Sequence, residues 1–475
     1  EFRRVLFRSY FPKYFTTKAI LLYILLMFVV SFAFLTHVLP FVWWIFGLAE
    51  VIGFFYFSNY LTRKWANYSP KLFVKQLFFL SLFLRLIWVF FSYLFYTNMT
   101  GQPFEFSTAD ALNYHDRAIW INYLMDKNNL KPYFDFVKES YSDAGYPTYL
   151  SFIYLLTDDS ILVSRILKAF YGAWMAVLVY KLSSRNFGDG TARIAAIFVA
   201  LMPNLILYSG LHLKEAEMVL LSVLFIERAD HLLRSEKFKF WDILVTFALA
   251  GSLFFFRTPL GIIALFALFT ALFFSSEKVM KLNRKLVIGV WALVAVAFLV
   301  GGVFSSEVNE LWSERSENQD TSIEWRAKRE GGNQFATYAS KSIFAPAIFI
   351  IPLPTIVRVD GQENQMLING GNYVKNILAF FAMFALFLIV KEKKWKDFML
   401  IASFTLGYLV VVALSAFAQS ERFHQPALPF LLILAAYGIS RVTNANKKFF
   451  IWYLVLIFVA IIAWSWFKLA GRGMI

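Results

Sequence analysis

Polar side chains that could do chemistry gather in short segments between long apolar stretches. A carboxylate can take a proton from an attacking hydroxyl or amine, and Lys or Arg can hold a phosphate, Arg in a bidentate manner. The candidate site residues are these charged groups and the polar side chains beside them: Asp110, Tyr114, His115, Asp143, His212, Lys214, Glu215, Arg257, Arg422 and His424.

Several candidates also have a purely structural interpretation. Ser107 and Asp110 resemble a helix-capping arrangement, in which Asp110 is an acid favoured by the helix dipole rather than a carboxylate aimed at a reaction centre. Lys214 and Glu215 fall in a short turn, where they could be charges that snorkel at the ends of two spans. Arg257 could be an ordinary interfacial arginine. The residue types alone leave these alternatives open.

Composition identifies the elements that must position these residues. The chain has 475 residues, of which 59% are hydrophobic, 20% aromatic and only 16% charged, with a mean hydropathy of +0.59. Soluble domains carry about a quarter charged residues. The sequence therefore predicts an all-α, polytopic integral membrane protein. Residues 1–9 read as a non-native leader and are left out of this prediction.

The net charge of +15 does not indicate a nucleic-acid partner. Lys and Arg fall in short runs between apolar stretches, such as 63–64, 391–394 and 447–448, which is the pattern of membrane topology rather than of a phosphate-binding surface. The chain has no cysteine, which excludes disulfides and thiolate metal sites. A divalent cation bound by outer-loop carboxylates is left open, because no spacing fixes its geometry.

Apolar stretches of roughly 17–25 residues predict about 13 transmembrane helices. Their expected positions are 19–36, 40–58, 76–97, 161–182, 191–208, 216–233, 242–256, 259–275, 287–304, 374–391, 398–417, 425–441 and 449–467.

A cytoplasmic N-terminus places the basic connections inside the cell. These are 59–75, 183–190, 228–240, 276–286, 391–397 and 442–448. The long loops 98–160 and 305–373 then both lie outside, as the positive-inside rule requires. We expect the candidate site residues on this outer face, with short amphipathic helices in the loops. The residues after Asp110 predict one such helix, with an apolar face at 112, 119, 120, 123 and 124.

Two apolar segments fit poorly as spans, 146–156 because it is short and 343–357 because it contains three prolines. We interpret both as interfacial or re-entrant segments sheltered by protein. Glu50, Arg85 and Lys168 fall within spans and need partners there. The predicted organisation is a membrane hairpin at 10–75, a catalytic core at 76–240, middle helices at 241–304, an outer loop at 305–373 and C-terminal helices at 374–475.

Several motifs resemble the GT-C superfamily of membrane glycosyltransferases, over roughly residues 70–440. They are Asp110-xxx-Tyr114, the helix entry Gly145-Tyr146-Pro147-x-Tyr149, Arg165, Pro203, Lys214-Glu215 and Glu421-Arg422-Phe-His424-x-Pro426-xx-Pro429. The resemblance is closest to the bacterial protein-mannosyltransferase and aminoarabinose-transferase-like branch. The chain departs from it in having Ala111 where many members have Glu after the catalytic Asp, and in two additional early spans.

The resemblance implies a GT-C-like core that transfers a sugar from a polyprenyl-phosphate donor to a glycan, lipid or protein acceptor outside the bacterial inner membrane. Asp110 then corresponds to the base, and Lys214 and Arg422 to the residues that hold the donor phosphate. The donor is itself the substrate, so no further cofactor is assigned.

Two other functions are compatible with the sequence. An O-antigen polymerase or ligase, which uses a polyprenyl diphosphate-linked glycan, would fit the many spans and the basic residues Arg326, Lys328 and Arg329. A secondary transporter or flippase fits less well, because the chain shows no paired halves with matching broken helices.

Overall fold

The computed structural model describes residues 10–106, 109–235, 240–276, 289, 345–415 and 417–475. Within these residues the regular structure is helical, joined by short turns and one isolated bridge between Val38 and Val357. The α-helices are α1 (Lys13–Ala33), α2 (Phe41–Lys64), α3 (Pro70–Thr100), α4 (Ala109–Asp126), α5 (Lys131–Glu139), α6 (Tyr141–Thr157), α7 (Ile161–Phe187), α8 (Asp189–Leu201), α9 (Pro203–Leu207), α10 (Glu215–Arg234), α11 (Phe240–Phe256), α12 (Thr258–Phe274), α17 (Glu363–Leu367), α18 (Asn369–Lys391), α19 (Met399–Ala413), α20 (Glu421–His424), α21 (Leu428–Arg441) and α22 (Lys447–Ala470).

Local sequence explains where the long helices begin. The hydroxyl of Ser69 accepts a hydrogen bond from the backbone N–H of Leu72, and Pro70 occupies the first turn of α3. Ser160 caps α7 in the same way, at Val163. Both serines occupy the position that this residue type prefers, and proline at a helix start leaves no hydrogen bond unmade.

The prediction of an integral membrane protein is supported by helix length and composition, but the count of 13 spans is not confirmed. Among the described residues, seven helices are long and apolar enough to cross a bilayer, or eight if the bent pair α8 and α9 is one span. Helices α11, α12 and α19 are apolar but shorter. The predicted span 216–233 corresponds to α10, which fails the same criterion, and the predicted span 287–304 lies outside the described helices.

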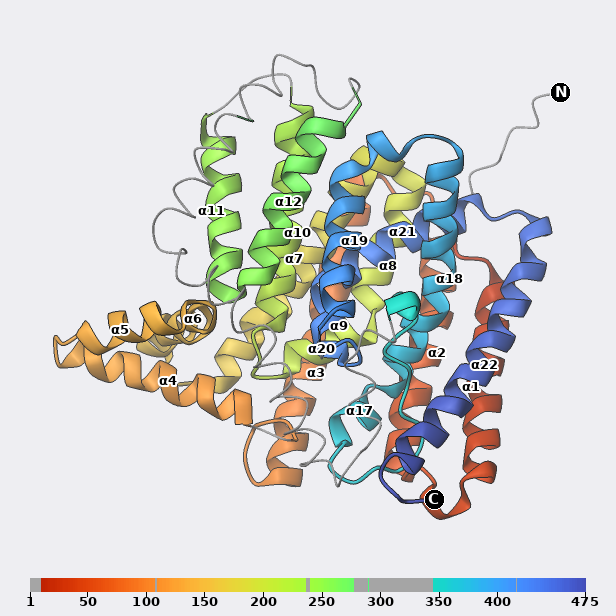
Figure 1. Ribbon diagram of the computed structural model, residues 1–475, viewed down its shortest axis with the longest axis horizontal. Coiled ribbons are helices and arrows are strands. Elements are labelled where there is room, and N and C mark those ends of the chain that lie inside the picture. Colours follow the sequence, from red (N-terminus) through yellow and green to blue (C-terminus); the bar gives the residue numbers. More distant parts are fainter. Residues whose placement is uncertain (1–9, 107–108, 236–239, 277–288, 290–344, 416) are drawn as a thin grey trace.

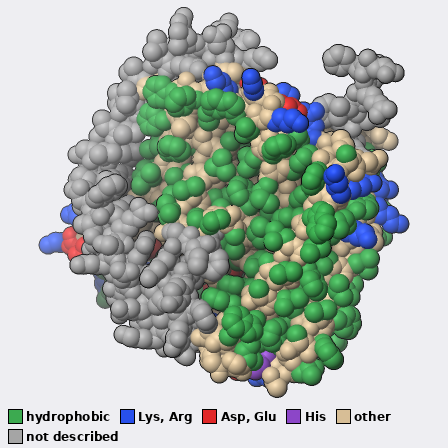
Figure 2. Space-filling view, turned by 45° about the vertical axis from the view of Figure 1, so that its right-hand side comes forward, with side chains coloured by type: hydrophobic (Ala, Val, Ile, Leu, Met, Phe, Trp, Pro, Cys, Tyr) green, Lys and Arg blue, Asp and Glu red, His purple; other side chains and the backbone are tan. Residues whose placement is uncertain are grey.

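Successive long helices run in alternate directions, so the connections between them gather at the two ends of the bundle (Figure 1). The end with the start of α1 also carries the turns 64–70, 187–189, 391–399 and 441–447. Figure 2 shows a largely hydrophobic face, with Lys and Arg near its upper edge. Helices α4, α5 and α6 lie crosswise at the opposite end of the bundle (Figure 1).

Helix α4 packs on α6, with Tyr114 against Tyr146, and its buried residues Ala111, Tyr114 and Ala118 follow one another at helical spacing. Ile119 and Tyr123 of the predicted apolar face are exposed instead. Leu124 of the same face is buried and Leu112 packs on the core, so the face lies partly on the protein, and its contact with the bilayer stays a prediction. Segment 146–156 is the main part of α6, which packs on α4 and α11.

Segment 343–357 does not form a spanning helix where it is described. Two side chains of α18 donate to its backbone instead: Lys375 Nζ to the carbonyl of Ile351, and Asn376 to the carbonyls of Ile350 and Pro352. Lys375 is 2% exposed and Asn376 is fully buried. Irregular backbone is thus satisfied by protein donors, as burial away from water requires.

The break between α8 and α9 explains the buried Arg85 of α3. Proline has no N–H, so Pro203 cannot donate to the carbonyl of Val199, four residues earlier. Arg85 supplies the missing donors: Nη2 lies 3.1 Å from the Val199 oxygen, and Nη1 lies 3.1 Å from the Ala200 oxygen. The two helices meet at an angle of 51°.

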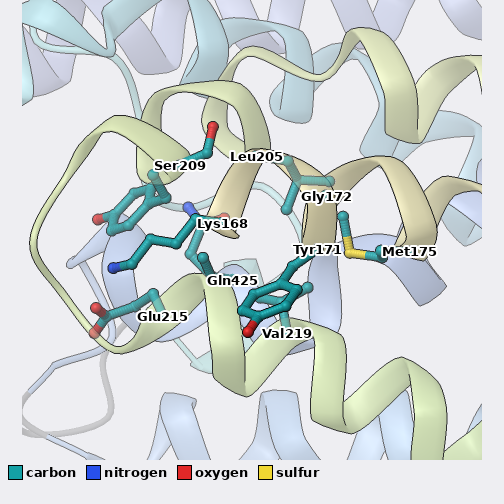
Figure 3. Close-up of a pocket in the computed structure, with 11 residues that line it drawn as sticks. Lys168, Tyr171, Gly172, Met175, Leu205, Ser209, Glu215, Val219 and Gln425 are labelled. Atoms are coloured by element: carbon teal, nitrogen blue, oxygen red, sulfur yellow. The ribbon is translucent and has the colours of Figure 1, made fainter. Parts of the chain in front are cut away.

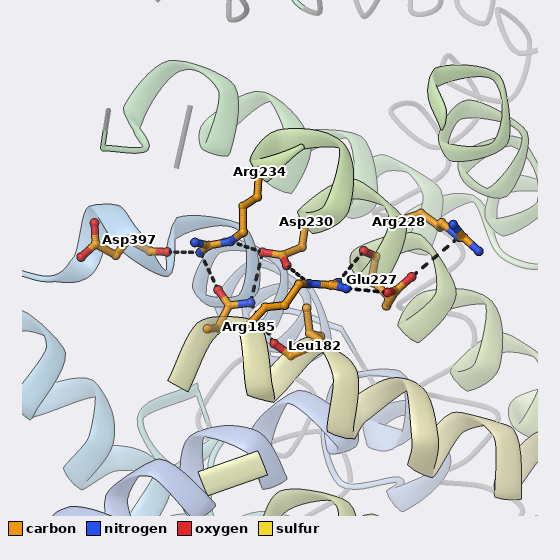
Figure 4. Close-up of polar contacts among 8 residues, drawn as sticks. Leu182, Arg185, Glu227, Arg228, Asp230, Arg234 and Asp397 are labelled. Atoms are coloured by element: carbon orange, nitrogen blue, oxygen red, sulfur yellow. Dashed lines mark hydrogen bonds and ion pairs between the residues drawn. The ribbon is translucent and has the colours of Figure 1, made fainter. Parts of the chain in front are cut away.

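The end of the bundle opposite α4 is fixed by ion pairs between α7 and α10 (Figure 4). Arg185 contacts Glu227 at 2.8 Å and Asp230 at 2.9 Å, and Arg234 contacts Asp230 at 2.9 Å. Arg234 also donates to the backbone oxygen of Asp397 at 3.1 Å. Because Glu227 and Asp230 are nearly buried, these contacts also neutralise charges that would be costly alone.

Candidate functional site

Arg422 is the centre of the candidate site. Its guanidinium forms ion pairs with Asp110, in the first turn of α4, and with Glu215, the first residue of α10. The side chain of Glu215 is fully buried, that of Arg422 is 20% exposed and that of Asp110 is 56% exposed. One cation thus connects a buried carboxylate with an accessible one.

Both carboxylates lie at helix N-termini, where the helix dipole favours negative charge. The structural interpretation of Asp110 and the functional one are therefore compatible. The N-terminus of α4 favours an acid at position 110. It also places the Asp110 side chain next to Arg422, which is distant in the sequence.

A second ion pair lies beside the first. Lys214 Nζ is 2.8 Å from Asp143 Oδ1 and 5.7 Å from the centre of the Tyr114 ring. Burial alone would raise the pKa of Asp143, but the charge and hydrogen bond of Lys214 hold it below its usual value. Burial lowers the pKa of Lys214, and Asp143 opposes that shift. Lys214 is therefore already paired, rather than free to receive an anion.

Arg257 approaches the same group from the turn between α11 and α12. Its guanidinium lies 4.1 Å from the centre of the Phe423 ring, within the range of a cation–π contact. Its charge also lowers the pKa of Asp143, after burial and the larger effect of Lys214. Arg257 thus adds positive potential beside the Lys214–Asp143 pair.

The turn that carries Lys214 is held by a buried lysine of α7. Lys168 Nζ donates to the Tyr146 hydroxyl at 2.8 Å and to the carbonyls of Leu211 and Leu213 at 2.9 and 2.5 Å. Glu217 lies 3.6 Å from the same nitrogen. Lys168 is fully buried, and these contacts provide the partners that a charge within a span requires.

Lys168 also borders a small cavity of about 10 Å³ beside Glu215, Ser209 and Gln425 (Figure 3). The size is about that of one water molecule. Glu215 Oε2 and Gln425 Oε1 have no hydrogen-bond partner among the described residues. The polar surroundings of the site therefore extend past Glu215 to this small, buried cavity.

His115 and His212 are joined through a tyrosine. The Tyr154 hydroxyl lies 2.7 Å from His115 Nδ1 and 3.1 Å from His212 Nε2. Burial lowers the pKa of both imidazoles, and for His212 the charges of Lys168 and Arg165 add to this effect. Both histidines are therefore neutral at pH 7.

His424 is separate from the other candidates. It is 2% exposed, lies 2.9 Å from Lys375 Nζ through Nδ1, and contacts the carbonyl of Ala418 at 2.8 Å through Nε2. These contacts connect α18 with the turn before α20. The geometry gives His424 a packing role, whereas a role in substrate binding stays an untested prediction.

A cavity of about 140 Å³ opens beside Arg422 and Asp110. Its walls come from α3, the following loop, the start of α4, the 207–213 segment, α17 and α20. The residues that line it are Tyr96, Glu105, Phe106, Asp110, Leu207, Tyr208, Leu211, Leu213, Asn364, Leu367, Ile368, Ser420, Glu421 and Arg422. The cavity thus combines two predicted site residues with several that the sequence did not single out.

Four residues that line the cavity were not among the predicted site residues: Tyr96, Glu105, Tyr208 and Glu421, although Glu421 belongs to the motif that contains Arg422. Tyr208 donates to Glu421 at 3.5 Å, and Glu105 Oε2 accepts from the backbone N–H of His212 at 3.3 Å. Two of them could have been found from the sequence, because both are acids close to candidate residues. Glu105 belongs to the acid-rich outer loop, and Glu421 directly precedes Arg422. Tyr96 carries no signal, because a tyrosine near the end of a span is common.

No group of three or more His, Asp or Glu side chains in the described ranges is arranged to hold a metal ion. The carboxylates near Arg422 are instead paired with cations, as in the Asp110–Arg422–Glu215 group.

Comparison with known proteins finds likeness to solved structures alone, and the likeness described here is weak. No protein-family model and no curated protein matches the chain. Among solved structures, an archaeal oligosaccharyltransferase from Archaeoglobus fulgidus, in complex with an inhibitory peptide and a dolichol-phosphate, shares 13% identity with a TM-score of 0.36. The likeness covers 70% of this chain and 48% of that one, so the chain spans about half the length of this neighbour. The residues of the site, rather than this likeness, carry the functional argument.

Proposed function

We propose that this chain is a membrane glycosyltransferase that moves a sugar from a polyprenyl-phosphate donor to an acceptor at the predicted outer face. The observation that carries the proposal is Arg422, held between accessible Asp110 and buried Glu215 at the wall of a cavity. A base and a phosphate-binding cation are the two groups that this transfer needs. Here they line the same cavity, at one end of a bundle of apolar helices.

The transfer is a single displacement with inversion. Asp110 accepts the proton of the acceptor hydroxyl or amine, whose oxygen or nitrogen forms a bond to the anomeric carbon. The bond between that carbon and the phosphate oxygen breaks, and the electron pair leaves with the polyprenyl phosphate. Arg422 stabilises the negative charge on this leaving group.

The two cations have different parts in the proposal. Arg422 has five N–H donors, so it can bind a phosphate while it keeps a contact with Glu215. Lys214 is already paired with Asp143 at 2.8 Å, so its charge is partly neutralised before a phosphate arrives. Arg422 is therefore the principal phosphate-binding residue, with Lys214 in a secondary role.

The donor chain and the acceptor enter from different surroundings. The isoprenoid chain stays in the bilayer, against the apolar helices, while a glycan, lipid or protein acceptor approaches Asp110 from the water side. We place the chain in the bacterial inner membrane, with this site on the extracytoplasmic face, by the charge distribution of its connections.

Transfer of a radiolabelled sugar from a polyprenyl-phosphate donor in proteoliposomes tests the proposal, with native membrane extract as the acceptor source. Asp110→Asn removes the base but keeps the size of the side chain, so we expect a loss of about 10²–10⁴-fold in rate. Asp126→Asn, an exposed acid at the other end of α4, is the matched control and should leave the rate unchanged.

Full transfer by Asp110→Asn would show that another group acts as the base. Absence of transfer by the wild type, together with activity toward a polyprenyl diphosphate-linked oligosaccharide, would overturn the proposed donor and favour a polymerase or ligase.

A further inference from the structure

Three residues that line the cavity beside Arg422 each carry a buried polar atom with no hydrogen-bond partner among the described residues. These atoms are the Tyr96 hydroxyl, Glu105 Oε1 and Asn364 Oδ1. Tyr96 is fully buried and Glu105 is 3% exposed. Buried polar atoms are nearly always paired in proteins, so three unpaired ones around one cavity point to a ligand that pairs with them.

The rest of each side chain is held in place. Glu105 Oε2 accepts from the backbone of His212 at 3.3 Å, and Asn364 Nδ2 donates to the carbonyl of Phe106 at 2.5 Å. The Tyr96 ring packs edge-on against Phe106, with 5.5 Å between ring centres. The unpaired atoms therefore belong to side chains whose orientation is already fixed, which favours specific binding.

The chemistry of these atoms selects among ligands. Glu105 Oε1 and Asn364 Oδ1 accept hydrogen bonds, and the Tyr96 hydroxyl can accept or donate. A ligand must therefore bring several donors into an uncharged or acidic environment. A phosphate brings negative charge and few donors, whereas the ring hydroxyls of a sugar donate in several directions.

We propose that the part of the cavity formed by Tyr96, Glu105 and Asn364 binds the sugar ring of the donor, a pentose or hexose, through its hydroxyl groups. This assignment rests on the proposed function and adds a location and a chemical basis for sugar recognition. The lipid phosphate lies at the Arg422 wall of the same cavity. The acceptor then reaches the anomeric carbon from the exposed side of Asp110.

Lipid binding to the purified full-length protein tests the assignment. The probes are undecaprenyl phosphate and its conjugates with glucose, mannose and arabinose, with affinity measured in nanodiscs. Tyr96→Phe removes only the unpaired hydroxyl, so no hydrogen bond within the described structure is lost. Tyr93→Phe, on the same helix but outside the cavity, is the matched control.

In the wild type, we expect at least one conjugate to bind more tightly than undecaprenyl phosphate. Tyr96→Phe should weaken that conjugate about five- to tenfold and leave undecaprenyl phosphate unchanged, because only the sugar contacts the hydroxyl. Glu105→Gln keeps a carbonyl for the N–H of His212 but puts a donor in place of an acceptor. It should produce the same selective loss.

The two proposals fail in different ways. If no conjugate binds more tightly than undecaprenyl phosphate, or if both variants weaken all four lipids equally, the sugar subsite is wrong even where Asp110-dependent transfer is observed. If the wild type binds none of the four lipids and transfers no sugar from them, the proposed function itself is wrong.

Discussion

Arg422 has two carboxylate partners that differ in exposure, and this difference determines what each substitution does. Arg422→Gln leaves Glu215 buried without its cation, which we expect to destabilise the protein by about 3–5 kcal/mol. Glu215→Gln keeps an acceptor for Arg422 and costs much less. The double variant Arg422→Gln/Glu215→Gln should recover most of the stability but none of the transfer activity.

Thermal unfolding of these variants in detergent, followed by tryptophan fluorescence, distinguishes the two effects of Arg422. A double variant as unstable as Arg422→Gln alone would mean that the loss does not come from the unpaired Glu215.

Among secondary-structure elements, the junction of α8 and α9 depends on one side chain of another helix. Arg85→Lys replaces a planar guanidinium, which reaches the carbonyls of Val199 and Ala200 together, with a single nitrogen. We expect a loss of about 1–3 kcal/mol, since a buried acceptor loses its donor. Arg63→Lys, at the exposed end of α2, is the control.

A double-mutant cycle with Pro203→Ala identifies the cause of that loss. Alanine restores an N–H that can bond to Val199, so Arg85→Lys should cost less in the Pro203→Ala background, by more than about 0.5 kcal/mol. Strictly additive effects would show that Arg85 acts elsewhere than at the break.

The sequence predicted most helices because a long apolar stretch is the direct consequence of contact with lipid. Twelve of the predicted spans overlap described helices, including α10 at 216–233. A full crossing by α10 is not confirmed, because its Glu215, Glu217, Glu227 and Asp230 lower its hydropathy; these acids are paired inside the protein, with partners on other helices. Hydropathy measures the composition of a segment and carries no information on such partners.

The same limit applies to the site. Asp110, Lys214 and Arg422 stood out because charges near the ends of spans are conspicuous, and the structure brings them close together. Their pairing depends on contacts between residues hundreds of positions apart, such as Asp110 with Arg422. His424 looked equally suitable in the sequence, but the nearby Lys375, which no pattern connects with it, holds it in a packing role.

For the whole molecule, the orientation in the membrane is the prediction that determines where substrates meet the site. The chain has no cysteine, so single cysteines can be introduced without a background. In intact cells, an impermeant maleimide should label Lys138→Cys of α5 and not Lys394→Cys, which should react only after permeabilisation. The reverse pattern would place the site in the cytoplasm.

The short α8 has a further consequence for the whole molecule. Its 13 residues rise about 20 Å, less than the roughly 30 Å hydrocarbon core of a bilayer. In Figure 1, α9 and α20 accordingly lie well short of the ends of α1 and α2. Arg422 of α20 is thus set back from those helix ends, next to the fully buried Glu215, where the effective dielectric constant is lower than in water. Coulomb attraction between the guanidinium and an incoming phosphate is correspondingly stronger there than in open water.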